Sequence, residues 1–279
     1  MVIFEGGYQA NSAVWSKVQP AIAAVTRACA YDRAGYGFSD PGPPPRNGRA
    51  IANDLDQALW AAHIHGPYVL VGHSAGALYA RLFAELRLRE VVGMVLVDPS
   101  VEHQDKAFAA AFGPGAGGVD ALLAKANQCL AASTAGKLPS TDPGIASCTP
   151  ASRRGSAADP DPATKAPFWR TSISELETLW TDTSDELDFS HRSYGAVPLV
   201  VLTADGTYAS VPARYREKAD AVWRDLHGRL AMLSSSGQER LVAGSSHMIM
   251  IDRPQSVIDA IEQVVRTARS KPQHLPTPR

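Results

Sequence analysis

The chain has 279 residues, 45% of them hydrophobic and 20% charged, and its formal net charge is −1 at pH 7. These proportions are ordinary for a soluble globular protein, and the absence of a basic stripe argues against a nucleic-acid partner. No apolar run reaches the roughly 18 residues of a membrane span. We therefore expect one large domain, or one domain with an inserted subdomain.

The first half of the chain alternates apolar runs with amphipathic stretches. The runs that indicate buried strands are Val2–Phe4, Val25–Tyr31, Tyr68–Val71 and Val91–Val97. Apolar residues recur at helical spacing in Ala13–Ala24, Asn47–His63 and Ala77–Leu88. Unbroken apolar strands are typical of a parallel sheet covered on both faces, and their alternation with helices indicates an α/β fold.

This alternation stops in the middle of the chain. Residues 105–195 show helical spacing only near 119–132 and 166–180, and the segments 113–118 and 157–162 resemble linkers. So long an excursion between two core strands is best interpreted as an inserted helical or loop lid.

The core pattern then resumes and runs almost to the end. The expected elements are a strand at Val197–Thr203, a helix at Ala213–Leu233, a strand at Glu239–Ala243 and a helix at Pro254–Arg266. We predict a doubly wound, mostly parallel α/β sheet formed by 1–104 and 196–268. A proline-rich tail, 269–279, is expected to be disordered.

The strongest chemical signal is Gly72-His73-Ser74-Ala75-Gly76, which spells G-x-S-x-G between an apolar strand and a helix. This is the layout of a nucleophile elbow, in which a sharp turn lifts a serine hydroxyl clear of the sheet. Side chains at Gly72 and Gly76 would collide across such a turn. The backbone N–H of Ala75 and the start of the helix would face negative charge that develops on a substrate.

A serine hydroxyl is a weak nucleophile unless a base and an orienting acid stand behind it. His247 is the candidate base, because it lies in a Gly/Ser loop after a late core strand. Two aspartates satisfy the order Ser…Asp…His: Asp98 ends the strand after the elbow helix, and Asp205 follows the next core strand.

Four segments together resemble the α/β-hydrolase superfamily. They are the loop Gly6–Tyr8 with Trp15 after it, the loop Tyr31–Ser39, the elbow, and Gly244–His247 ahead of a C-terminal helix. The resemblance implies an oxyanion hole formed by the backbone N–H groups of Tyr8 and Ala75. It also suggests that Asp32 and Arg33 form a buried structural pair.

The match to the superfamily is incomplete. The superfamily's first two strands have no counterpart, Gly6 stands where His-Gly is common, and the usual G-x-x-D after the later strand is not matched cleanly. Thr207 and Tyr208 occupy that region instead. The superfamily's majority points to Asp205, whereas some branches place the acid where Asp98 stands. We favour Asp98 and keep Asp205 as the alternative.

These residues predict a serine hydrolase that cleaves an ester through an acyl-enzyme on Ser74, without a metal or an organic cofactor. An aspartate at the elbow would have suggested epoxide or haloalkane hydrolysis. The alternatives are lactone or amide hydrolysis, acyl transfer, or a non-catalytic ligand-binding protein. Aromatic residues of the predicted lid that are candidates to line the substrate pocket are Phe168, Trp169, Trp180 and Tyr194.

The sequence leaves the cellular compartment of the protein open. No positively charged segment followed by an apolar core opens the chain, so as it stands we expect a cytoplasmic protein, or a secreted or periplasmic one if a leader has been removed. A bridge between Cys129 and Cys148 would need an oxidising compartment. The pattern leaves that bridge undecided and makes no prediction of oligomeric state.

Overall fold

The computed structural model describes residues 1–149, 162–190 and 193–270. They contain a six-stranded sheet with strand order β2-β1-β3-β4-β5-β6, in which every two neighbouring strands are parallel. The strands are β1 (Val2–Glu5), β2 (Ala28–Ala30), β3 (Tyr68–His73), β4 (Val91–Val97), β5 (Leu199–Ala204) and β6 (Gly237–Val242). The expected strands are therefore confirmed, although β2 is shorter than its apolar run.

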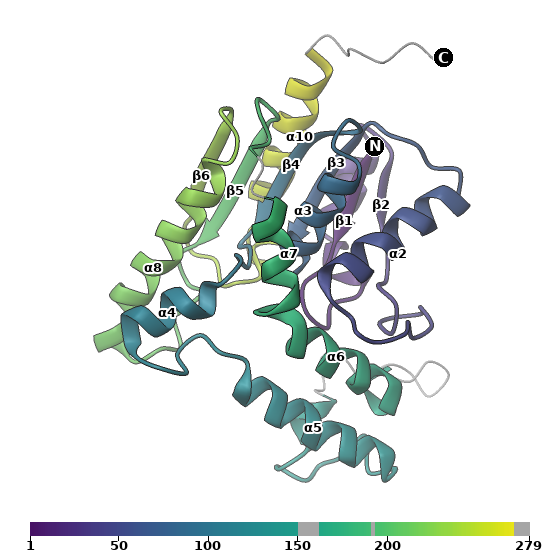
Figure 1. Cartoon of the computed structure of the whole chain (residues 1–279), viewed down its shortest axis with the longest axis vertical. Coiled ribbons are helices and arrows are strands. Elements are labelled where there is room, and N and C mark those ends of the chain that lie inside the picture. The colour runs from purple at the N-terminus through teal and green to yellow at the C-terminus, as the bar shows by residue number, and fades with distance from the viewer. Residues whose placement is uncertain (150–161, 191–192, 271–279) are drawn as a thin grey trace.

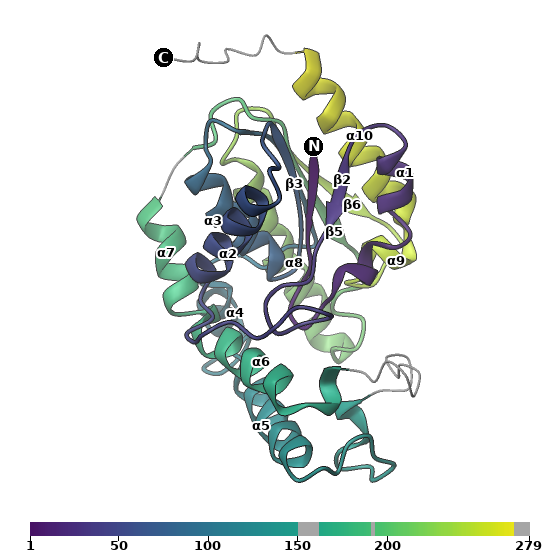
Figure 2. The same ribbon diagram turned by 90° about the vertical axis from the view of Figure 1, so that its right-hand side faces the viewer.

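Helices cover both faces of the sheet, as a doubly wound fold requires (Figure 2). One face carries η1 (Ser12–Trp15), α1 (Gln19–Ala23), α9 (Ile249–Asp252) and α10 (Pro254–Ser270). The other carries α2 (Gly48–Ala61), α3 (Gly76–Leu86) and α8 (Ala213–Ala231). Because side chains alternate along each strand, β4 sends Met94 and Leu96 into one hydrophobic cluster and Val95 and Val97 into the other.

Two predicted segments differ in the structure. The helix expected over Ala13–Ala24 is divided into η1 and α1, and Pro20 stands in the first turn of α1, where a missing N–H costs nothing. Helix α10 continues to Ser270, so the start of the predicted tail is helical. Residues 271–279, like most of the predicted linker 157–162, lie outside the described residues.

The described part of the long segment between β4 and β5 contains four helices. They are α4 (Gln104–Phe112), α5 (Asp120–Thr134), α6 (Ala166–Leu179) and α7 (Asp182–Ser190), with short 3₁₀ turns η2 (Ala146–Cys148) and η4 (Pro162–Thr164). Only α5 and α6 were anticipated by the sequence pattern. Helix α4 packs on α8, and α7 packs on α2 and α3. The middle of the segment, α5 and α6, projects beyond one end of the sheet (Figure 1).

Among the described residues, no helix combines the length and the apolar character needed to cross a membrane.

Candidate active site

Ser74 lies in the sharp turn between β3 and α3, with a φ of +52° in the left-handed region. The two flanking glycines are required by close contacts. A Cβ added at Gly72 would lie 2.7 Å from the Cα of Ala77. A Cβ added at Gly76 would lie 2.4 Å from the carbonyl oxygen of Gly6. The turn is therefore strained at the serine and packed against the β1 loop, as expected of a nucleophile elbow.

Backbone hydrogen bonds fix Ser74 to the end of the neighbouring strand β4. The N–H of Ser74 donates to the carbonyl of Val97 at 3.2 Å, and the carbonyl of Ser74 accepts from the N–H of Ser100 at 3.0 Å. Asp98 lies between these two partners. The elbow and the first candidate acid thus belong to one rigid piece of backbone.

His247 meets Asp98 and not Asp205. Its Nδ1 lies 2.6 Å from Oδ2 of Asp98, whose side chain is completely buried. Asp205 instead accepts the backbone N–H groups of Gly244 at 2.9 Å and Ser245 at 3.1 Å, in the loop that leads to the histidine. Asp98 therefore occupies the position of an orienting acid, and Asp205 holds the loop.

The carboxylate of Asp98 receives donors on both oxygens. Oδ1 accepts the N–H of Ala204 at 2.9 Å and the indole N–H of Trp223 at 2.9 Å. Oδ2 accepts from Thr207 as well as from His247. Burial alone would raise the pKa of Asp98, but the hydrogen bond and charge of His247, with the Thr207 hydroxyl, outweigh it and place that pKa below its ordinary value. Asp98 is thus an anion at neutral pH.

His73 is an uncharged companion of His247. Their ring centroids lie 4.6 Å apart, and Nε2 of His73 donates to the backbone carbonyl of His247 at 3.1 Å. Burial, with the nearby charge of His247 as a second cause, lowers the pKa of His73 to about 3. His73 therefore holds the histidine loop without adding a positive charge at neutral pH.

A cavity of about 700 Å³ lies over the elbow, which we call the serine cavity. Ser74 and His247 both line it, together with Tyr8 from the loop after β1 and Phe168 from α6. Ala75, the other predicted oxyanion-hole residue, is the N-cap of α3 and directly follows the serine. Tyr8 and Ser74 thus line one cavity, and α3 begins directly after the residue that follows the serine.

A buried arginine fixes that loop. Arg33 donates to the carbonyl of Gly6 at 2.5 Å and to that of Gly7 at 2.7 Å. It also pairs with Glu5 at 2.8 Å and with Glu175 of α6 at 3.2 Å, and all three side chains are buried. Because both carbonyls of the loop accept hydrogen bonds from Arg33, the backbone of the loop is held in one conformation.

The predicted pair of Asp32 with Arg33 is wrong. Asp32 accepts the backbone N–H groups of Ser12 at 2.6 Å and Phe38 at 2.9 Å, so it closes two loops. Both residues brace the region, as expected. The buried arginine pairs with carboxylates, and no local pattern indicates that Glu175, 142 positions away in the chain, lies within its reach.

Of the four aromatic residues proposed for the substrate pocket, only Phe168 lines the serine cavity. Trp169 is buried in the cluster between α5 and α6, and its indole N–H donates to the carbonyl of Ala163. Trp180 packs against the main core, and Tyr194 is buried there beside Arg81. The structure corrects the prediction for these three residues, because their rings fill cores instead of the cavity.

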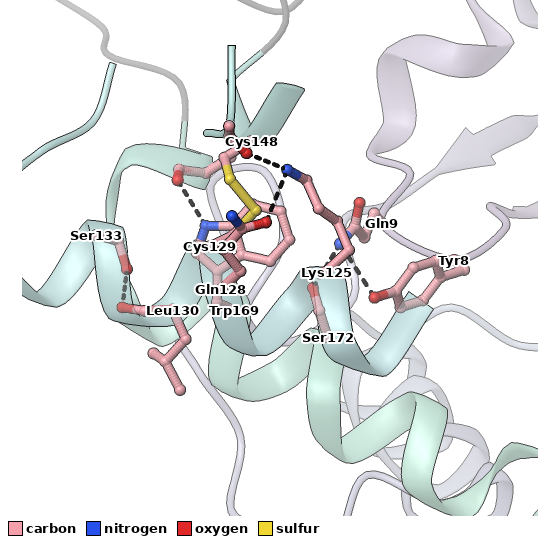
Figure 3. The surroundings of a disulfide bond; sticks show 12 residues. Tyr8, Gln9, Lys125, Gln128, Cys129, Leu130, Ser133, Cys148, Trp169 and Ser172 are labelled. Atoms are coloured by element: carbon pink, nitrogen blue, oxygen red, sulfur yellow. Dashed lines mark hydrogen bonds between the residues drawn. A yellow bond between two sulfur atoms is a disulfide. The ribbon is translucent and has the colours of Figure 1, made fainter. Parts of the chain in front are cut away.

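A disulfide joins Cys129 of α5 to Cys148 of η2 (Figure 3). It lies in the same small cluster as Trp169, and the rings of Trp169 and Phe168 are 5.1 Å apart. On the core side, Gln9 donates to the hydroxyls of Tyr8 at 3.1 Å and Ser172 of α6 at 3.2 Å. Helix α6, which lines the serine cavity with Phe168, therefore contacts both the disulfide cluster and the β1 loop.

One group of side chains among the described residues has the spacing of metal ligands. Atoms of His103, Asp185 and Asp188 lie within 4.8 Å of one another. His103 already forms a hydrogen bond with Asp188, and Asp185 is exposed. None of the three lines the serine cavity.

Comparison with known proteins agrees with this fold. Residues 3–260 match the family model described as Alpha/beta hydrolase family. An uncharacterized protein of Schizosaccharomyces pombe is 42% identical over 81 residues, which make up 29% of this chain and 15% of that protein. The chain thus spans a small part of that relative's length.

Solved structures show the same fold at low identity. The epoxide hydrolase CorEH superposes with a TM-score of 0.62 at 14% identity, covering 95% of this chain and 91% of that one. A thermophilic esterase from Thermogutta terrifontis gives a TM-score of 0.55 at 19% identity, with 96% and 90% covered. These neighbours differ in chemistry, so the reaction has to be argued from the site.

Proposed function

Because this chain belongs to the alpha/beta hydrolase family, we propose that it is a serine esterase that cleaves carboxylic esters of small or medium organic molecules. The observation that carries the proposal is the combination of a left-handed Ser74 with His247 in the same cavity and a 2.6 Å contact from His247 to buried Asp98. These are the groups that nucleophilic attack on a carbonyl needs.

In the proposed reaction, Oγ of Ser74 attacks the ester carbonyl carbon while Nε2 of His247 accepts the hydroxyl proton. Asp98 keeps the Nδ1–H of His247 directed toward itself and stabilises the imidazolium. The oxyanion is stabilised by the backbone N–H groups of Ala75 and Tyr8. His247 then returns the proton to the departing alkoxide, which leaves as an alcohol, and a water activated by His247 releases the acid from Ser74.

The site favours ester hydrolysis over the chemistry of the epoxide hydrolase neighbours. The elbow places a hydroxyl, not a carboxylate, at the attacking position. A hydroxyl assisted by a histidine forms an acyl-enzyme with an activated carbonyl, and lactones, amides or acyl transfer to another alcohol would use the same steps. A non-catalytic binding role would not require the acid to be held by donors on both oxygens.

The test is hydrolysis of p-nitrophenyl esters of increasing chain length, with a lactone, an anilide and styrene oxide alongside. We expect Ser74→Ala to lower kcat by at least about 10³-fold, because the attacking atom is lost. The exposed Ser235 supplies a matched control, Ser235→Ala, which should behave as wild type. Wild-type turnover in Ser74→Ala, or opening of styrene oxide without ester hydrolysis, contradicts the proposal.

The disulfide leads us to infer that the protein works in an oxidising compartment, where such bonds persist. Alkylation of the native protein in situ should then modify Cys29 and leave Cys129 and Cys148 unlabelled. Labelling of all three thiols would contradict a secreted or periplasmic location and favour the cytoplasm.

A further inference from the structure

Thr207 shares an oxygen of Asp98 with the base. The hydroxyl of Thr207 donates to Oδ2 at 2.5 Å, and Nδ1 of His247 lies 2.6 Å from the same atom. The other oxygen, Oδ1, is taken by the N–H groups of Ala204 and Trp223. A carboxylate has about four acceptor positions, two on each oxygen. Thr207 therefore fills the one place on Oδ2 that the histidine does not use.

The loop that carries Thr207 also holds the histidine. Directly after β5, the carboxylate of Asp205 accepts the N–H groups of Gly244 and Ser245. The N–H of Gly206 donates to the carbonyl of Ser245 at 2.9 Å, and a Cβ at Gly206 would lie 2.6 Å from that oxygen. Three consecutive residues thus bind the base's loop on one side and the acid on the other. We call residues 205–207 the clamp.

This arrangement follows from the parallel sheet. Strands β4, β5 and β6 are parallel neighbours. Asp98, the clamp and the loop of His247 follow these strands in turn, so they all lie at the carboxyl end of the sheet. The backbone N–H of Ala204 fixes only Oδ1 of Asp98. Among the described residues, Oδ2 has one hydrogen-bond partner besides Thr207, which is His247 itself, so without Thr207 no independent donor would hold that oxygen in the plane that His247 needs.

We propose that Thr207 is a positioning residue of the esterase site, which sets the orientation of Asp98 toward His247 through its hydroxyl. The inference rests on the proposed function. Thr207 is not among the residues that line the serine cavity, so it acts through the acid alone. Asp205 and Gly206 hold the histidine loop, and Thr207 transmits the position of that loop to the carboxylate.

The pH dependence separates this role from a merely structural one. The hydroxyl of Thr207 helps to lower the pKa of Asp98, so its removal should raise that pKa. The acidic limb of kcat/KM, which requires Asp98 as an anion, should then shift to higher pH. The other ionisable groups near Asp98 remain uncharged at neutral pH: burial lowers the pKa values of His227 and His73, and it raises the pKa of Tyr208.

The experiment compares Thr207→Val, Thr207→Ala and Thr207→Ser with p-nitrophenyl acetate as the probe. We expect Val and Ala to lower kcat roughly 10- to 100-fold with KM within about threefold, since a hydrogen bond to a charged group is lost in a step where that charge acts. Thr207→Ser should stay within about threefold of wild type because it keeps the donor. The exposed Ser210 in the same loop gives the control Ser210→Ala.

A second measurement does not depend on turnover. The Nδ1–H proton of His247 should give a strongly downfield NMR signal in the wild type, and that signal should move upfield or broaden in the Val and Ala variants. Unchanged kcat, pH profile and NMR signal in either variant overturn the proposal, as does a serine variant no better than the alanine one. If Ser74→Ala keeps its activity, the proposed esterase function is wrong, whereas the NMR result still decides the role of Thr207.

Discussion

The two sides of the serine cavity are built in different ways. On the strand side, Asp98 is completely buried, accepts donors on both oxygens, and belongs to the same backbone segment that holds Ser74. On the helix side, Phe168 belongs to a small cluster between α5 and α6 that is closed by a disulfide. The strand side is therefore fixed by the main core, and the helix side by a satellite core of its own.

This difference assigns separate tasks to the two sides. Catalytic groups must be held within a fraction of an ångström, which suits residues at the ends of core strands. A wall that admits substrate can be less stable, since local opening draws on regions with few buried contacts. In α5, the buried residues are only Ala126, Cys129 and Ala132. We propose that the projecting part of the 105–195 segment acts as the lid.

The largest effect is expected from a substitution on the strand side of the serine cavity. Asp98→Asn keeps the shape of the acid but favours the wrong histidine tautomer, which lowers kcat roughly 10⁴-fold in serine proteases. Asp205→Asn should lower kcat less than about tenfold, because Asp205 supports only the loop of His247. Steady-state kinetics on p-nitrophenyl acetate compares the two. A larger loss of kcat in Asp205→Asn would identify Asp205, in the clamp, as the acid.

The next effect removes the ion pairs that connect the two sides. Arg33→Leu leaves Glu5 and Glu175 buried without a partner, so we expect the free energy of unfolding to fall by about 3–5 kcal/mol. Urea denaturation measures the loss. The matched control is Arg229→Leu, whose pair with Asp225 is exposed and should contribute less than about 1 kcal/mol. Equal losses in both variants would show that the buried network does not hold the β1 loop.

The smallest effect on turnover is expected from removing the disulfide on the helix side of the serine cavity. Replacing Cys129 and Cys148 together by serine should destabilise the cluster by about 3 kcal/mol, the magnitude expected for a bridge of this loop length. Hydrogen exchange should then accelerate in α5 and α6 but not in β3 or β4. Turnover of p-nitrophenyl acetate should stay within about twofold, while KM for long-chain esters rises. Exchange that accelerates equally in β4 would show that the helix side is part of the main core.

Much of this architecture could be predicted from local sequence, because local patterns report local structure. The apolar runs identify the strands, and the glycines around Ser74 identify a turn that only they permit. The choice between Asp98 and Asp205 could be weighted toward Asp98 from local patterns but not settled by them. It depends on the direction of two carboxylates at neighbouring strand ends, and the donors that decide it, Thr207 and Trp223, are 109 and 125 positions from Asp98.

Three of the four aromatic residues proposed for the substrate pocket do not line the serine cavity, for a related reason. A ring in a helix with few apolar neighbours is ambiguous between a pocket and a small core, and only the fold shows which face it presents. Trp169 turns toward Cys129 and Ala163, whereas its neighbour Phe168 reaches the cavity. One residue of difference in position on α6 separates the two roles.

The proposed esterase mechanism requires that the ester be cleaved through a covalent intermediate on Ser74. Rapid quenching of the reaction with p-nitrophenyl acetate, followed by proteolysis and mass spectrometry, measures it directly. We expect one added acetyl group on the peptide that contains Ser74 and none in Ser74→Ala. Turnover without an acetylated serine, or an acetyl group on another residue that turns over at the same rate, would contradict it.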